Sequence, residues 1–185
     1  MRVIAGVYGG RRLKAVPGMK TRPTTDKVKE SMFNIIGPYF SGGVSLDLFA
    51  GSGGLSIEAV SRGVDHAYLV DRQYQAIRTI NENIEITKEP NKFSVFKNDA
   101  ERILEKLHNE KIKIDYLFLD PPYKEQKIML LLSRIVSLNL LNKDAIVVCE
   151  TDQDAHLTDN ILNFELKRRA DYGITEVIVY QYRGE

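Results

Sequence analysis

The chain has 185 residues, of which 43% are hydrophobic and 28% are charged. These proportions are those of an ordinary globular protein and exclude a disordered chain. No apolar run approaches the roughly 20 residues that cross a bilayer, and the N-terminus lacks the apolar stretch of a signal peptide. The single cysteine, Cys149, excludes an internal disulfide and a cysteine metal cluster. We therefore expect a cytoplasmic protein without membrane or metal contacts, and by default a monomer.

The charge is unevenly distributed, although the net charge is only +1. Residues 1–30 contain eight Lys or Arg and two acids, whereas the remaining residues contain 18 bases and 23 acids. A basic segment on an acidic body suits a partner with a phosphate backbone. A solvated basic surface without a partner would show the same charges, so the pattern alone leaves both interpretations open.

The chain is expected to begin with a small basic extension, residues 1–22, ahead of a main domain at 23–185. Apolar residues at 3–5 and 13–16 flank Gly9-Gly10, which predicts a β-hairpin with a glycine turn. In the following segment Val28, Met32, Ile35 and Ile36 recur at helical spacing. The Gly37-Pro38 pair predicts the end of that helix.

From residue 44 onward, predicted strands alternate with predicted helices. Strands are expected at 44–48, 66–70, 93–96, 115–119 and 145–149, and helices at 55–62, 74–84, 103–107 and 128–138. Such alternation predicts an α/β fold with a mostly parallel sheet. Two further strands, 163–169 and 176–182, predict a C-terminal antiparallel hairpin. Seven strands in this arrangement are typical of the Rossmann-like class I methyltransferase fold.

A glycine-rich turn follows the first of these strands, where Gly51 and Gly53 join it to a helix. Glycines there let a ligand approach the backbone, and ligands of such sheets bind at the carboxyl ends of the strands. The next strand ends at Asp71, an acid that can accept both ribose hydroxyls of an adenosine. Nucleotide cofactors and S-adenosylmethionine share this geometry, and glycines can also serve only a tight turn.

Two details favour S-adenosylmethionine over a dinucleotide. The dinucleotide fingerprint ends in Gly or Ala at the place where this chain has Ser56. The turn is also preceded by Asp47 in the pattern Asp-x-Phe-x-Gly-x-Gly, which is typical of class I methyltransferases. The cofactor-binding residues expected on this basis and on the family resemblance below are Thr24, Asp47, Phe49, Ala50, Gly51, Ser52, Gly53, Asp71, Arg72, Asp99 and Ala100.

The candidate catalytic motif is Asp120-Pro121-Pro122-Tyr123, directly after the fourth strand. An exocyclic amine of a base is a poor nucleophile, because its lone pair is conjugated into the ring. Asp120 and the carbonyl of Pro121 can accept its two N–H bonds, and the prolines fix the backbone. Tyr123 offers a face on which an extruded base can stack. Direct attack on the methyl group would then depend mainly on positioning.

Together these residues resemble the RsmD-type guanine-N2 methyltransferases of bacterial small-subunit ribosomal RNA. Further resemblance lies in RVIAG at residues 2–6, GRRL at 10–13 and RPTTDKVKESMFN at 22–34. It implies methylation of one guanine N2 in 16S rRNA, in the 30S subunit or an assembly intermediate. The chain departs from the family at Gln73 and Tyr74, where many members have an acid followed by Arg.

The resemblance also implies roles for single residues. Asp47, Gly51 and Gly53 would line the methionine end of the cofactor, Asp71 would hold the ribose, and Asp99 with Ala100 would face the adenine. Arg22, Thr24 and Thr25 would close over the cofactor or the target base. With an RNA substrate, the basic N-terminal segment becomes the expected docking surface, through Arg2, Arg11, Arg12, Lys14 and Arg22.

Three other functions remain as alternatives. DNA amino methyltransferases and protein methyltransferases share the Asp/Asn-Pro-Pro-Tyr motif, although DNA enzymes usually carry an added recognition domain. A non-catalytic RNA-binding assembly factor could keep the fold, and the intact glycine turn with Asp71 and Asp120 disfavours it. A nicotinamide-dependent oxidoreductase is disfavoured by Ser56 and by the Pro-Pro turn.

Overall fold

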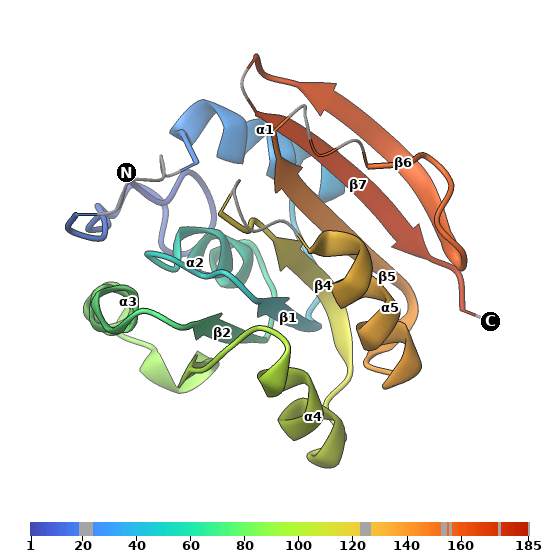
Figure 1. Cartoon of the computed structure of the whole chain (residues 1–185). Helices are drawn as coiled ribbons and strands as arrows, with labels where there is room; N and C mark the ends of the chain where they lie inside the picture. The colour runs from blue at the N-terminus through green and yellow to red at the C-terminus, as the bar shows by residue number, and fades with distance from the viewer. Residues whose placement is uncertain (19–23, 123–126, 153–154, 156, 174, 185) are drawn as a thin grey trace.

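A seven-stranded sheet runs through the structure in the order β3-β2-β1-β4-β5-β7-β6 (Figure 1). The structure is a computed structural model that describes residues 1–18, 24–122, 127–152, 155, 157–173 and 175–184. The expected site residues Arg22 and Tyr123, and the expected domain boundary at residue 22, therefore lie outside the described residues. The strands are β1 (Val44–Asp47), β2 (His66–Asp71), β3 (Phe93–Lys97), β4 (Ile114–Leu119), β5 (Leu141–Thr151), β6 (Phe164–Asp171) and β7 (Glu176–Tyr182).

The first five strands are parallel, and β7 runs antiparallel to both of its neighbours, β5 and β6. The predicted α/β fold with a C-terminal antiparallel hairpin is confirmed. The strand β5 is longer than predicted. It begins at Leu141, which pairs with Ile114, and it includes the polar residues 142–144 that precede the predicted strand.

Helices cover the two faces of the sheet in unequal groups (Figure 1). One buried cluster joins side chains of α1, α2 and α3 to one face, and includes Phe118 and Val148. A second buried cluster joins α4 and α5 to the other face. It includes Leu117 and Val147, which directly precede Phe118 and Val148 in the chain. Successive residues of a strand thus feed opposite cores. The helices are α1 (Asp26–Ile36), α2 (Gly54–Ser61), α3 (Tyr74–Thr87), α4 (Arg102–Asn109) and α5 (Ile128–Ser137), with a 3₁₀ turn η1 (Pro90–Lys92).

The helices that the structure describes are short, and none of them has the length and apolarity that a membrane span requires.

Helix α1 begins where its sequence provides a cap. The hydroxyl of Thr25 accepts a hydrogen bond of 3.2 Å from the N–H of Val28, which satisfies a free donor of the first turn. The helix ends at Gly37, as predicted. Its buried residues are Lys29, Met32 and Phe33, so the buried face is rotated from the predicted stripe. The reason is the aromatic contact of Phe33 with Phe118 in the sheet, at 5.8 Å between ring centroids.

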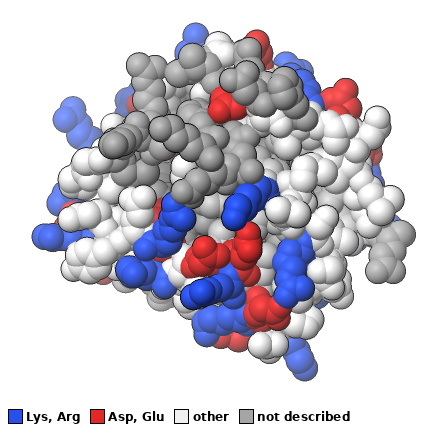
Figure 2. Space-filling model, in the orientation of Figure 1, with Lys and Arg blue, Asp and Glu red and all other residues white. Residues whose placement is uncertain are grey.

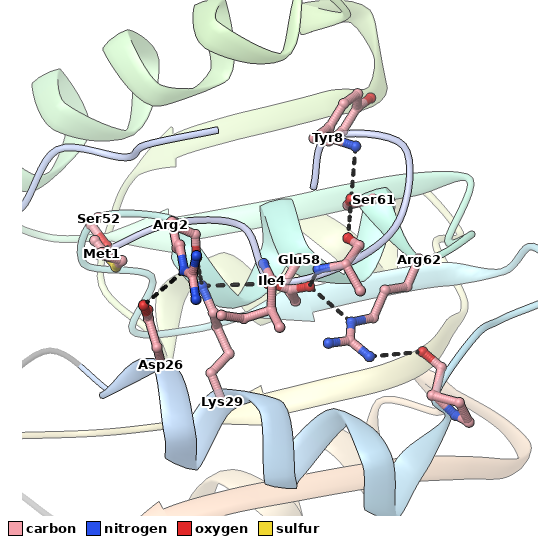
Figure 3. Close-up of polar contacts among 12 residues, drawn as sticks. Met1, Arg2, Ile4, Tyr8, Asp26, Lys29, Ser52, Glu58, Ser61 and Arg62 are labelled. Carbon is pink, nitrogen blue, oxygen red and sulfur yellow. Dashed lines mark hydrogen bonds and ion pairs between the residues drawn. The ribbon is translucent and has the colours of Figure 1, made fainter. Parts of the chain in front are cut away.

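The N-terminal extension reverses direction as predicted, but it forms a single antiparallel bridge, between Arg2 and Arg12, instead of two regular strands. Two of its backbone donors are directed to the main domain instead: the N–H groups of Ile4 and Ala5 donate to the carboxylate of Glu58 in α2, at 2.8 and 3.1 Å (Figure 3). Side chains of the extension, including that of Val3, are buried in the same cluster as α1 and α2. The extension is therefore packed onto the main domain through α2.

Candidate functional site

A cavity of about 620 Å³ opens at the carboxyl ends of β1, β2 and β4, the edge at which parallel sheets of this kind bind ligands. The cavity brings together residues from both predicted motifs. The predicted site residues that line it are Thr24, Asp47, Phe49, Ala50, Gly51, Ser52, Asp71, Arg72, Asp99, Ala100, Asp120, Pro121 and Pro122.

Gly53 is the one predicted cofactor residue that does not line the cavity. It precedes α2 with a φ of +84°, in the left-handed region that favours glycine. An added Cβ there would approach the side chain of Leu69 to 3.2 Å. Gly53 therefore shapes the turn, and its contact with the cofactor stays a prediction.

The glycine turn is held in place by hydrogen bonds to two neighbouring elements. The N–H of Gly51 donates to Oδ2 of Asp71 at 2.9 Å. The side-chain amide of Asn83 in α3 donates to the carbonyl of Ser52 at 2.8 Å. Gly51 has a φ of +57°, and a Cβ added to it would have no neighbour within 4 Å. A ligand can therefore lie directly against this part of the backbone.

Asp71 is also fixed on its second oxygen, because Oδ1 accepts the N–H of Gln73 at 2.9 Å. Each carboxylate oxygen has capacity for a further hydrogen bond. The carboxylate is thus oriented by the backbone before a ligand arrives, and it can still accept the two hydroxyls of a ribose. The open space over Gly51 and this oriented carboxylate fit an S-adenosyl group.

Asp47 is a buried acid at the end of β1, with an exposed fraction of 1%. Burial raises its pKa to about 7, and the nearby charges of Asp71 and Glu150 add to the increase. The N–H of Phe49 donates to its Oδ1 at 3.1 Å and opposes that increase. Asp47 can therefore exchange a proton near neutral pH while facing the cavity.

Asp120 lies in the same acidic environment at the end of β4. Burial raises its pKa well above the ordinary value, and the charges of Glu150 and Asp47 raise it further. Sequence reasoning missed Glu150, which lies in β5 and is 6% exposed. Its only sequence signal is an acid that directly follows the buried run 145–149.

The cavity wall also contains residues that were not predicted, among them Met1 and Lys29. The thioether of Met1 lies 3.6 Å from the hydroxyl of Ser52 (Figure 3). Lys29 was counted among the cations of the basic segment, yet it is 1% exposed. Its Nζ donates to the carbonyl of Arg2 at 2.6 Å and lies 3.4 Å from Glu58. Burial lowers its pKa.

The predicted RNA-binding residues that the structure describes lie outside the cavity lining. Arg2 pairs with Asp26 at 3.4 Å, and Lys14 pairs with Glu82 at 3.1 Å, both on the surface. Arg11 instead donates to the carbonyls of residues 86 and 87 at the end of α3, at 3.1 and 2.9 Å. Arg12 is exposed. The extension thus contains both docked and outward-facing cations.

On the face drawn in Figure 2, Lys and Arg side chains lie beside Asp and Glu side chains, and neither sign forms a continuous patch among the described atoms. A mixed face of this kind attracts a polyanion weakly.

Comparison with known proteins gives consistent matches over the whole chain. Residues 1–181 match the family model described as "Conserved hypothetical protein 95". The chain is 49% identical to the "Putative rRNA methyltransferase YlbH" of Bacillus subtilis, over 100% of both proteins. It is 30% identical to the "Ribosomal RNA small subunit methyltransferase D" of Haemophilus influenzae, over 98% of this chain and 93% of that protein.

Among solved structures, the "Putative methyltransferase yhhF from Escherichia coli" superposes with a TM-score of 0.86 at 28% identity, and the match covers 100% of this chain and 99% of that one. This match and the others confirm the predicted class I methyltransferase fold. They also confirm the predicted cofactor, S-adenosylmethionine. The chain belongs to the Conserved hypothetical protein 95 family of RsmD-like methyltransferases.

Proposed function

We propose that the protein transfers the methyl group of S-adenosylmethionine to the exocyclic N2 of one guanine in 16S rRNA, in the 30S subunit or an assembly intermediate. One observation carries the proposal: Asp120, Pro121 and Pro122 line the same cavity as Gly51 and Asp71. An acceptor set for an amine thus lies beside the site that fits the methyl donor. The substrate class is supported by two relatives, one named as a putative rRNA methyltransferase and the other as a methyltransferase of the small-subunit ribosomal RNA.

The cofactor, when bound, supplies a methyl group on a positively charged sulfur. The residues of the chain do the positioning. The oriented carboxylate of Asp71 would accept the ribose hydroxyls, and the backbone of Gly51 would lie under the donor. Asp47, ionised above a pKa of about 7, would face the charged methionine end.

The amine of the target base would be held by Asp120 and the carbonyl of Pro121. Accepting its N–H bonds turns the nitrogen lone pair toward the methyl group, which is a near-attack arrangement. The nitrogen must lose one proton as the new N–C bond forms, and Asp120 is the nearest acceptor in this arrangement. Tyr123 remains the proposed stacking residue for the extruded base.

The substrate would approach over the N-terminal extension. Arg12, with Arg2, Lys14 and Arg22, is proposed to contact phosphates, whereas Arg11 is occupied by backbone carbonyls of α3. Of these residues, Arg2, Arg12 and Lys14 are described by the structure, and they lie outside the cavity lining.

The test is transfer of labelled methyl groups from S-adenosylmethionine to 30S subunits from a strain that lacks this gene. The rRNA is digested to nucleosides, and the product is identified by mass spectrometry. We expect N2-methylguanosine at one position. Asp120→Ala should abolish transfer while S-adenosylmethionine still binds. Label in another nucleoside would reject N2, and full activity of Asp120→Ala would reject the mechanism.

A further inference from the structure

Glu150 lies beside the proposed catalytic acid, although it is far from it in sequence. In the parallel pair β4–β5, Leu119 is aligned with Cys149. The next residues are Asp120, directly after β4, and Glu150, the second-last residue of β5, so the two acids are neighbours at the carboxyl ends of adjacent strands. Glu150 is close enough to Asp120 for its charge to raise the pKa of Asp120. Oε2 of Glu150 also accepts the hydroxyl of Thr24 at 2.6 Å.

The charges that face this pair are mostly negative. Asp47, at the end of β1, raises the pKa of Asp120 through its charge. On the other side, β7 places the apolar Val177 opposite Glu150. The buried cation Lys29 also lines the cavity, but its Nζ is engaged by Glu58 and by the carbonyl of Arg2. Among the described residues no Lys or Arg forms an ion pair with Glu150.

Two adjoining buried carboxyl groups, with no ion-pairing cation among the residues that the structure describes, cannot both ionise easily, so they share one proton. The hydrogen bond that Thr24 donates to Oε2 of Glu150 favours the ionised form of Glu150 and opposes the rise that burial causes in its pKa. Burial raises the pKa of Asp120 well above its ordinary value. Asp120 is therefore the protonated partner and the donor, and Glu150 is the ionised acceptor.

We propose that Glu150 is a positioning residue that takes the O–H of Asp120 and thereby turns the other oxygen of Asp120 toward the target amine. This inference rests on the proposed function. As the N–C bond forms and the C–S bond of the donor breaks, the N–H proton passes to the free oxygen of Asp120. The proton already on Asp120 passes to Glu150, so the released proton ends on Glu150 and both carboxyls are neutral.

Glu150→Gln tests the relay, because an amide of nearly the same shape can accept both hydrogen bonds but cannot take up the proton. General acid–base assistance is worth about 10²- to 10⁴-fold. We expect kcat on 30S subunits to fall about 100-fold or more, with the KM for S-adenosylmethionine within about 3-fold of the original protein. The wild-type kcat should decrease at low pH as Glu150 becomes protonated, and Glu150→Gln should lose that decrease. Glu150→Asp, which keeps a carboxyl group, should recover part of kcat.

A second readout needs no turnover. The infrared carbonyl band of protonated carboxyl groups is followed against pH in the cofactor-free protein. The shared proton should be held to higher pH in the wild-type protein than in Glu150→Gln, in which Asp120 loses its negatively charged neighbour. The matched control is Glu176→Gln, an acid of the adjacent strand β7 that pairs with Arg169 at 2.9 Å. It should leave both readouts unchanged.

An unchanged kcat in Glu150→Gln, or a lower kcat with an unchanged infrared titration, would overturn the inference. The proposed function fails separately, if the wild-type protein methylates no 30S rRNA. In that event the titration still tests the shared proton, because it requires neither the cofactor nor the substrate.

Discussion

The Nζ atom of Lys29 lies 3.4 Å from Oε1 of Glu58, and both side chains are almost completely removed from solvent. Glu58 also binds Nε of Arg62 at 2.8 Å and two backbone N–H groups of the N-terminal extension (Figure 3). One carboxylate thus connects α1, α2 and the extension. Since Lys29 and Met1 line the cavity, this connection also shapes the wall of the cofactor site.

Glu58→Ala should therefore be strongly destabilising, because it leaves Lys29 and Arg62 buried without their counter-charge. Removal of one partner of a buried ion pair costs about 3–5 kcal/mol. Urea denaturation followed by circular dichroism measures this free energy of unfolding. The control is Glu82→Ala, which removes an exposed partner of Lys14 and should change stability little. Equal stability losses in the two variants would show that the buried network contributes no more to stability than an exposed ion pair.

The order of strands and helices could be predicted from the sequence because the parallel strands contain short apolar segments that are followed by polar residues. The glycine turn and Asp71 were also predictable, since both follow from the end of a strand. These features depend on the spacing of residues that are close in sequence, and this spacing determines the secondary structure that is observed in the fold.

The acid Glu150 and the cation Lys29 could not be predicted in the same way. The role of Glu150 depends on the register of β4 against β5, which sets it beside Asp120. Lys29 is buried because Glu58, 29 residues away, supplies its counter-charge. Arg11 was expected to bind RNA, and only the fold shows that carbonyls at the end of α3 receive its guanidinium. Such long-range pairings leave no periodic signal in the sequence.

Asp47→Asn should make stability less dependent on pH. The folded-state pKa of Asp47 is raised from 3.8 to about 7, so the folded protein holds this proton more tightly than the unfolded chain. Stability is therefore lost as pH rises from about 4 to about 7. Asn remains neutral and can still accept the N–H of Phe49. The variant should be more stable at pH 8, by about 1–4 kcal/mol, and nearly equal at pH 4.

The same substitution should weaken cofactor binding, because Asp47 lines the cavity and loses its negative charge. Thermal unfolding from pH 4 to 8 and calorimetric titration with S-adenosylmethionine measure the two effects. A variant less stable than the wild type at pH 8 would contradict the raised pKa.

Asp71→Ala should lower the affinity for S-adenosylmethionine about 10- to 100-fold, because hydrogen bonds to a charged group contribute about 1.5–3 kcal/mol. It removes the acceptor of the ribose hydroxyls and releases the N–H of Gly51. Calorimetric titration gives the Kd. The matched control is Asp65→Ala, since Asp65 accepts the N–H of Gly43 at 3.0 Å before β2, at the opposite end of the strand. An equal loss of affinity in the control would assign the effect to general destabilisation.

Arg12→Ala and Arg11→Ala should have different effects, although the two residues are adjacent. The exposed Arg12 is free to contact a phosphate, so its loss should weaken binding to 30S rRNA and reduce the slope of log K against log salt by about one. Arg11 holds the extension to α3 and lies 5.2 Å over the ring of Tyr8. Its loss should lower the melting temperature and leave the salt slope nearly unchanged. Filter binding at several salt concentrations, paired with thermal unfolding, separates the two outcomes. A reduced slope in Arg11→Ala and none in Arg12→Ala would reverse this assignment and place the RNA on the α3 side of the extension.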